Sequence, residues 1–322
     1  RRMSLDVDDI VDQLGGGLQV AADSLGEHPR FSQYKNAGKA LDGQAERRRE
    51  ALERQSKARQ RIYDSIRGIL EGEEEKGRSA RENRQVPRKR KYADVLMTSE
   101  WLVDIPEEGR EDTWVALLVP VGKRCLLVTE QGRTNLYNKA GVFQKSFSSL
   151  LPGGGTRGGD CILDVIWDSN RLRLYCLDIL RWNGVELFDS NFQLRRFFLT
   201  SRLEENNKLT EISARNQVAV HALPSELADK NGLGTLVNST IDFEVDGILF
   251  YHPEVLYTSG QSPLVGWLKP WMLPELLQVP VPQCLMTGAP ACAMKFIEDF
   301  NRKHKHVSKV KNEGIIAEEM QE

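Results

Sequence analysis

The sequence predicts an α+β fold in which one long basic helix precedes a mainly antiparallel β core. Residues 44–71 contain no proline and a single glycine, and they consist largely of Ala, Glu, Arg, Gln and Leu, which favour a helix. From residue 114 onward, short apolar runs alternate with turn residues, which is the pattern of strands. We expect strands at 114–119, 124–129, 134–138, 161–167, 172–179, 195–199, 216–220, 246–251 and 264–268.

Shorter segments complete the expected element order. Residues 92–106 predict a short helix followed by an extended exit, and the stretch from 291 onward predicts a helix that leads into a polar tail. Residues 72–91 are charged and lack an apolar period, as in a solvated linker. The basic run from Pro87 to Lys91 is interpreted as part of this linker, and a short nuclear signal is the alternative.

The predicted helix has a narrow apolar stripe between basic faces. Eight cations between residues 46 and 71 are offset by five acids, a mixture that suits an acidic receptor groove better than a phosphate lattice. The stripe is too narrow for tight packing on the β core, so we expect the helix to fold mainly on a partner. The stripe consists of Leu52, Ala58, Ile62, Ile66 and Ile69.

Bulk composition excludes several classes of protein. The chain has 322 residues and a formal net charge of -2, which suits about two domains and argues against a strongly basic nucleic-acid coat protein. No run approaches the length of a membrane span, and the N-terminus lacks the apolar stretch of a secretory signal. Five scattered cysteines indicate reduced thiols, with no disulfide frame and no metal site.

Four stretches of the predicted β core carry a recognisable order of motifs. They are "VPVGKR", "LYCLDILRW", "FEVDGILFY" and "LVGWLKP". In this order they resemble the guanylyltransferase/nucleotidyltransferase-like fold of DNA ligases and mRNA guanylyltransferases. Those enzymes have Lys-x-Asp-Gly-x-Arg at the first stretch, where this chain has Val119 and Val121 in place of the lysine and the aspartate.

The replaced residues are those that catalysis needs. Covalent nucleotidyl transfer requires an amine nucleophile, and phosphoryl transfer requires a metal held by carboxylates. Val119 has no lone pair, and Leu180 stands where the family has its metal-associated glutamate. We therefore expect a binding protein with no catalytic residue, no metal and no cofactor. A divergent guanylyltransferase or ligase with Lys123 as nucleophile is the enzyme alternative.

Seven motifs then indicate one family. "HPRFSQYK", "ERRREALERQSKARQ", "SEWLVDIP", "PVGKR", "FSSLLPGG", "EVDGILFYH" and "PLVGWLKPWM" occur in this order, and the chain resembles the snurportin family over roughly residues 28–275. The resemblance implies a nuclear import adaptor that binds the 2,2,7-trimethylguanosine cap of spliceosomal U snRNPs together with importin-β. It implies shuttling between nucleus and cytoplasm, an export receptor of the leucine-rich-signal type as a further partner, and no membrane.

The resemblance also divides the chain. It implies a flexible N-terminus at 1–27 that contacts the export receptor, an importin-β-binding domain at 28–71 and the linker at 72–91. A cap-binding domain at 92–290 and a C-terminal helix and tail at 291–322 follow. A nonspecific RNA-binding protein is the third alternative.

The residue roles that the resemblance implies fall into two sets. Tryptophan faces suit a methylated guanine because its base is cationic, and lysine and arginine suit the phosphate chain. The implied cap-binding set is Ser99, Trp101, Gly122, Lys123, Arg124, Lys139 and Trp267. The implied importin-β-binding set is Arg47, Arg48, Arg49, Arg54, Ile62 and Ile66.

Overall fold

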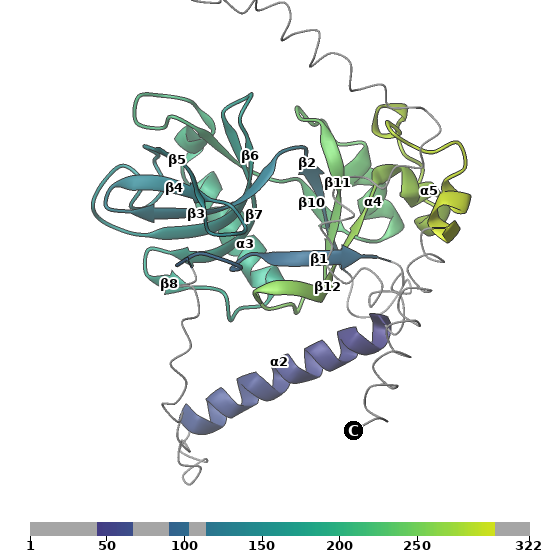
Figure 1. The fold of residues 1–322 in the computed structure, drawn as a ribbon, viewed down its shortest axis with the longest axis horizontal. Coiled ribbons are helices and arrows are strands. Elements are labelled where there is room, and N and C mark those ends of the chain that lie inside the picture. The colour runs from purple at the N-terminus through teal and green to yellow at the C-terminus, as the bar shows by residue number, and fades with distance from the viewer. Residues whose placement is uncertain (1–43, 67–89, 103–113, 300–322) are drawn as a thin grey trace, which may run out of the picture. The chain divides into compact units, whose positions relative to one another are not determined.

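The computed structural model describes residues 44–66, 90–102 and 114–299 (Figure 1). Helix α2 (Gln44–Ile66) precedes a body made mainly of strands, and most strand pairs are antiparallel. The predicted α+β class and the early basic helix are therefore confirmed. The expected segment at 1–27, parts of those at 28–71 and 291–322, and most of the linker at 72–91 lie outside the described residues.

Twelve strands form two sheets within the described part of the chain. The five-stranded sheet has the order β1 (Met97–Trp101), β12 (Gly260–Leu268), β11 (Val245–Tyr251), β2 (Val115–Pro120) and β10 (Ser225–Leu227). The larger sheet has the order β5 (Phe143–Phe147), β4 (Arg133–Tyr137), β3 (Lys123–Glu130), β6 (Cys161–Asp168), β7 (Arg173–Trp182) and β8 (Val185–Glu186), and β9 (Ala219–Ala222) pairs with β7. Only two pairs among these strands are parallel, β1 with β12 and β7 with β9.

The main core lies on one face of the larger sheet. Its buried apolar side chains come from β3, β4, β6 and β7, and they pack against α3 (Phe192–Glu204) and η3 (Asn207–Thr210). The shorter helices are α4 (Lys230–Val237), η4 (Pro270–Met272), α5 (Leu273–Leu277) and η5 (Gln283–Leu285). Residues 293–299 are helical, as predicted for the segment after 291. In the described residues, we find no helix with the length and apolar character needed to cross a bilayer.

Two predicted elements are wrong. The expected strand at 195–199 lies inside α3, whose first turn is capped by the Asn191 side chain accepting a hydrogen bond from the Leu194 amide. Phe192, Arg195, Leu199 and Leu203 are buried at helical spacing, so the continuous apolar run reflects a helix packed on the core.

The expected helix in residues 92–106 is instead strand β1 over its described part. Trp101 lies opposite Trp267 in a parallel pairing with β12. This pairing joins segments far apart in the chain, and it overrides the helical propensity of the segment.

Helix α2 contacts the β body, although the sequence predicted an apolar stripe too narrow for tight packing there. Gln44 donates to the Trp101 carbonyl at 3.0 Å, and Arg47 forms two hydrogen bonds to the Glu100 carboxylate, at 2.5 and 2.8 Å. These contacts come from glutamine and arginine side chains, and Ala51 on the same helix is buried. Ala58, a member of the predicted apolar stripe, is exposed.

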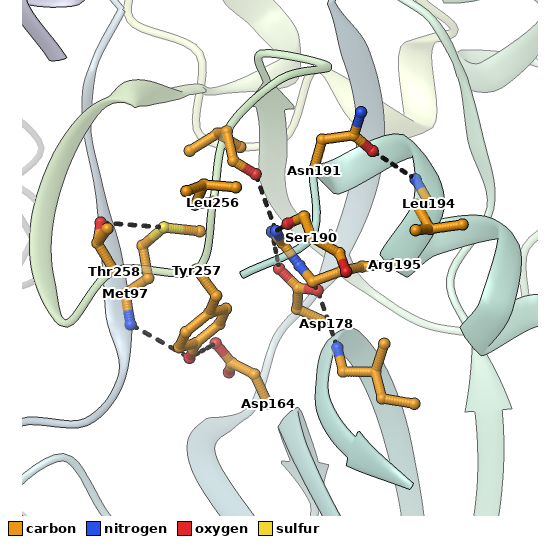
Figure 2. A network of polar contacts seen from close by, with 12 residues as sticks. Met97, Asp164, Asp178, Ser190, Asn191, Leu194, Arg195, Leu256, Tyr257 and Thr258 are labelled. Atoms are coloured by element: carbon orange, nitrogen blue, oxygen red, sulfur yellow. Dashed lines mark hydrogen bonds and ion pairs between the residues drawn. The ribbon is translucent and has the colours of Figure 1, made fainter. Parts of the chain in front are cut away.

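A chain of buried polar contacts connects the larger sheet to β1 (Figure 2). Asp164 on β6 accepts two hydrogen bonds from Arg124 on β3, at 3.0 and 2.6 Å, and one from the Tyr257 hydroxyl at 2.8 Å. The same hydroxyl accepts a hydrogen bond from the Met97 amide at 3.2 Å, where β1 begins. Tyr257 therefore links the two sheets through one oxygen atom.

A second buried pair fixes the segment that leads into β12. Arg195 and Asp178 are both almost fully buried and share two hydrogen bonds of 2.8 Å. The Arg195 guanidinium also donates to the carbonyls of Ser190, at 2.5 Å, and Val255, at 2.8 Å. Every one of these groups has a partner, which a charged pair in a core requires.

We expect Tyr257→Phe to lower the free energy of unfolding by about 1–3 kcal/mol, because it leaves the buried Met97 amide without an acceptor and removes one donor from Asp164. Tyr251→Phe is the matched control, since the buried Tyr251 hydroxyl has no hydrogen-bond partner among the described residues. Denaturant unfolding of both variants measures the difference. Equal losses would show that the Tyr257 hydroxyl is not what connects the sheets.

Candidate functional site

Two tryptophans from distant parts of the sequence meet on neighbouring strands. Trp101 and Trp267 are paired in register on β1 and β12, and their ring centroids lie 5.8 Å apart with the planes inclined by 48°. Each side chain is about 4% exposed. The structure thus brings together the two aromatic residues of the predicted cap-binding set, in mutual contact and buried.

Trp267 has a cation as a second neighbour. The Lys269 ammonium lies 5.1 Å from the centroid of the Trp267 ring and donates to the Asp246 carbonyl and carboxylate at 2.6 and 3.1 Å. An ammonium at this distance from an indole makes a cation–π contact. The indole of Trp267 therefore already contacts an aromatic ring and a positive charge, the two properties that a methylated guanine base combines.

The position of the Trp267 indole depends on Gly247. A Cβ atom at Gly247 would lie 2.4 Å from Nε1 of Trp267 and 2.6 Å from its Cε2, closer than any side chain tolerates. Gly247 on β11 is thus the residue that lets the indole lie against the neighbouring strand.

The positions that carry catalysis in the resembling enzymes are apolar or already paired here. Val119 is buried on β2, and Leu180 is buried on β7. Asp178, retained from the enzyme pattern, is held by Arg195. At Gly266, a Cβ atom would lie 2.7 Å from Cδ1 of Leu102. A larger side chain there would require Leu102 to move.

The predicted cationic residues lie on the other sheet. Gly122 is in the turn between β2 and β3, Lys123 is exposed at the start of β3, and Lys139 is exposed in the turn after β4. Arg124 differs from the two lysines because its guanidinium is bound to the buried Asp164. Burial alone would lower the pKa of Arg124, but the Asp164 carboxylate outweighs it, so the pKa is raised and the side chain stays charged.

Ser99 precedes an acid that the sequence analysis missed. Ser99 is buried on β1, and the next residue, Glu100, is buried and accepts hydrogen bonds from Arg47 and Gln44. Asp164 and Tyr257 were also missed. The available signal was a single acid inside an apolar strand, as in "CILDVIW", because such an acid is rarely buried without a partner.

The predicted importin-β-binding residues lie on α2 with different environments. Arg48 is buried, with its guanidinium 5.1 Å from the Trp114 ring centroid, whereas Arg49 is exposed and pairs with Glu46 on the same helix. Arg54 is exposed and donates to the Glu50 carbonyl. Ile62 and Ile66 lie near the end of the helix, and their side chains are outside the described ones.

Among the described residues there is no cluster of three or more His, Cys, Asp or Glu side chains that could hold a metal ion. The acids nearest the tryptophans are instead engaged with basic side chains: Glu100 binds Arg47, and Asp246 binds Lys269. The arrangement offers aromatic and cationic contacts to a ligand.

Two family models match the chain. Residues 95–270 match the model described as "Snurportin1, m3G cap-binding domain", and residues 28–68 match the model described as "Snurportin1". The chain belongs to the snurportin1 family. The first match covers the β body with both tryptophans, and the second covers a segment that includes all of α2.

Solved structures with partial likeness are DNA ligases. The ligase domain of LigD from M. tuberculosis is 12% identical with a TM-score of 0.36, covering 55% of this chain and 58% of that one. A mycobacterial DNA ligase D complexed with ATP and MES is 15% identical with a TM-score of 0.36, covering 55% and 59%. The chain thus spans less than three fifths of the length of these two structures, and the family assignment depends on the family models alone.

We expect Gly247→Ala in the snurportin1-family chain to cost about 1–3 kcal/mol of stability, because the added methyl group overlaps the Trp267 indole. The displaced indole should also change the tryptophan fluorescence of the folded protein. Gly234→Ala is the control, because a Cβ at Gly234 on α4 meets nothing within 4 Å and alanine favours a helix. An unchanged melting temperature and spectrum for Gly247→Ala would remove Gly247 as the determinant of the indole position.

Proposed function

We propose that the protein is a nuclear import adaptor that binds the trimethylguanosine cap of U snRNPs through its β body and importin-β through α2. The observation that carries the cap assignment is the pairing of Trp101 with Trp267 inside the segment that matches the m3G cap-binding domain. In this proposal the protein shuttles between nucleus and cytoplasm, and an export receptor binds the N-terminal segment.

The chemistry of the tryptophan pair supports a cationic base as ligand. A methylated guanine stacked on the Trp267 indole would gain cation–π attraction of the kind that Lys269 makes now. Because the two indoles contact each other and are buried, the base can enter only if Trp101 or Lys269 moves from the ring. Apolar Val119 and Val121 near the turn to β3 would not reject the N2 methyl groups, since they present no polar group that the methyls leave unpaired.

The phosphate chain is assigned to the larger sheet. Lys123 and Lys139 are exposed there and suit phosphate as point charges. Arg124 has a different role in this proposal. Its ion pair with Asp164 holds β3 in position, and its positive charge attracts a phosphate without contacting it.

A second function, nucleotidyl transfer with Lys123 as nucleophile, finds less support. Lys123 begins β3 in the larger sheet, whereas Val119, at the nucleophile position of the enzymes, is on β2 in the other sheet. A lysine four residues further along and on another strand cannot replace the lost amine.

We expect Trp267→Ala to weaken binding of a trimethylated cap analogue by about 1–3 kcal/mol, the range for stacking of one base on an aromatic side chain. Fluorescence titration well below the unfolding temperature measures the affinity. Trp271→Ala is the matched control, because Trp271 is about 5% exposed and packs against Phe296. It should lose stability without losing affinity.

Equal affinity losses in the two variants would assign Trp267 to the core rather than to the ligand. Incubation of the parent with GTP and magnesium, followed by mass spectrometry of the intact chain, tests the enzyme alternative on the same sample. A guanylate adduct on any lysine would contradict the proposed function.

The double variant Arg49→Glu, Arg54→Glu should abolish capture by importin-β and leave cap affinity within about twofold, because both arginines are exposed and bind residues of their own helix. Pull-down on immobilised importin-β and cap-analogue titration are performed on one preparation. Arg47→Glu is the contrasting variant, since it also places a carboxylate beside Glu100 and so disturbs the helix contact. Loss of both activities in the Arg49, Arg54 variant would contradict the division into two binding modules.

A further inference from the structure

Three aromatic side chains cluster at the edge of the larger sheet, away from the tryptophan pair. The Tyr92 and Tyr137 ring centroids lie 4.6 Å apart, and those of Tyr137 and Phe143 lie 6.1 Å apart. We call Tyr92, Tyr137 and Phe143 the aromatic face. The Phe143 side chain is 53% exposed, and the two tyrosines are half-buried. An exposed phenylalanine beside two half-buried tyrosines leaves ring surface in contact with water.

The strand alternation explains why these rings face solvent. Leu136 on β4 belongs to the main core, so its neighbours Arg133, Asn135 and Tyr137 are related by the two-residue period to the opposite face of the sheet. Phe143 lies on β5, the edge strand of the sheet, and is paired with Tyr137 on β4. In the strand order of the described residues, no strand pairs with the outer edge of β5.

Basic side chains surround the aromatic face. Four exposed cations lie on it or in the segments that meet it, Arg90, Lys91, Arg133 and Lys139, against two acids, Glu130 and Asp94. Glu130 is already engaged: it lies 3.7 Å from the Lys91 ammonium and accepts a hydrogen bond from the Tyr137 hydroxyl at 3.4 Å. Lys91 also lies 4.7 Å from the Tyr92 ring centroid. The charge balance of this surface is therefore positive.

The aromatic face joins the proposed cap site through the backbone. The Asp94 amide donates to the Lys139 carbonyl at 2.9 Å, and Ala93 forms a bridge with Ala140. These two contacts place the turn that carries Lys139 beside Tyr92. Lys139 is also one of the residues proposed to contact the cap phosphates. A chain that leaves the cap phosphates at Lys139 meets the aromatic face next.

We propose that the aromatic face binds the single-stranded RNA that follows the cap, with a base stacked on Phe143 and phosphates near Arg133 and Lys91. Proteins that bind single strands combine aromatic stacking surfaces with a basic track, because every base has a π-face and every nucleotide a negative charge. This inference rests on the proposed cap binding for the direction of the RNA. The contact itself does not require a cap.

The test uses the full chain and three fluorescently labelled probes. They are a trimethylated cap dinucleotide, a ten-nucleotide unstructured RNA with the same cap, and that RNA without a cap. In the parent, the capped decamer should bind more tightly than the dinucleotide. Phe143→Ala should weaken decamer binding about tenfold, within the range for one stacked base, and leave dinucleotide affinity within about twofold. Phe197→Ala is the matched control, because Phe197 on α3 is 70% exposed and outside the aromatic face.

Salt dependence gives an independent readout of the charges. Removing one phosphate contact from a single strand reduces the magnitude of the slope of log affinity against log salt by about 0.7. Arg133→Gln should produce that change for both decamers, whereas Arg215→Gln, at an exposed arginine in the loop before β9, should produce none.

The outcomes separate this inference from the proposed function. If the dinucleotide binds and the capped decamer binds no more tightly, the aromatic face is not an RNA surface. Equal effects of Phe143→Ala and Phe197→Ala would also overturn it. If a peptide of ten glutamates displaces the uncapped decamer equally from the parent and from Phe143→Ala, the surface selects negative charge and fits an acidic protein partner instead. If the dinucleotide fails to bind but the uncapped decamer binds in a manner dependent on Phe143, the cap assignment fails and this inference stands.

Discussion

The buried carboxylate of Asp164 is the constraint on which the arrangement of the candidate site depends. A carboxylate in a protein interior is strongly destabilising unless charged and polar partners surround it. Arg124 and the Tyr257 hydroxyl provide those partners, and that hydroxyl also accepts a hydrogen bond from the Met97 amide. Because Met97 begins β1, the bonds that satisfy Asp164 also fix the strand that ends in Trp101. The contact between Trp101 and Trp267 thus depends on a charge located in the other sheet.

The same requirement explains what the charged residues of the nucleotidyltransferase-like pattern contact in this structure. Asp178 stands where the enzymes have the first acid of a metal-associated motif, and here it is neutralised by Arg195, which also binds the carbonyls of Ser190 and Val255. These bonds hold the segment before β12 in place. Burial raises the pKa of Tyr257, and the Asp164 carboxylate raises it further, so the hydroxyl keeps the proton that it donates. Asp164 and Asp178 thus both hold neighbouring segments of the β body together through buried hydrogen bonds.

Sequence patterns predicted the parts of the fold that depend on local composition. Strands β2, β3, β6, β7, β11 and β12 were expected because each contains an alternating or continuous apolar run. The helix-favouring composition of residues 44–71, which lack proline, was sufficient to place α2. The expectations failed where a distant partner decides the structure. Strand β1 exists through its parallel pairing with β12, and the run around Phe197 is helical because one of its faces packs on the core. The site residues remain predictions made from residue type, and the sequence contains no sign that Arg124 is bound to Asp164, or that Arg47 reaches Glu100.

The segment from Arg90 to Trp101 shows why contacts with distant residues, which the sequence does not reveal, matter for function. Read as a helix, it would place Tyr92 and Trp101 as unrelated side chains of one compact element. It instead turns beside the aromatic face at Tyr92, bridges to the β4–β5 turn at Ala93, and becomes extended only in β1, which reaches Trp101. One short stretch of protein therefore contacts both the aromatic face and the tryptophan pair, the two surfaces that we propose for the first nucleotides and for the cap of one RNA.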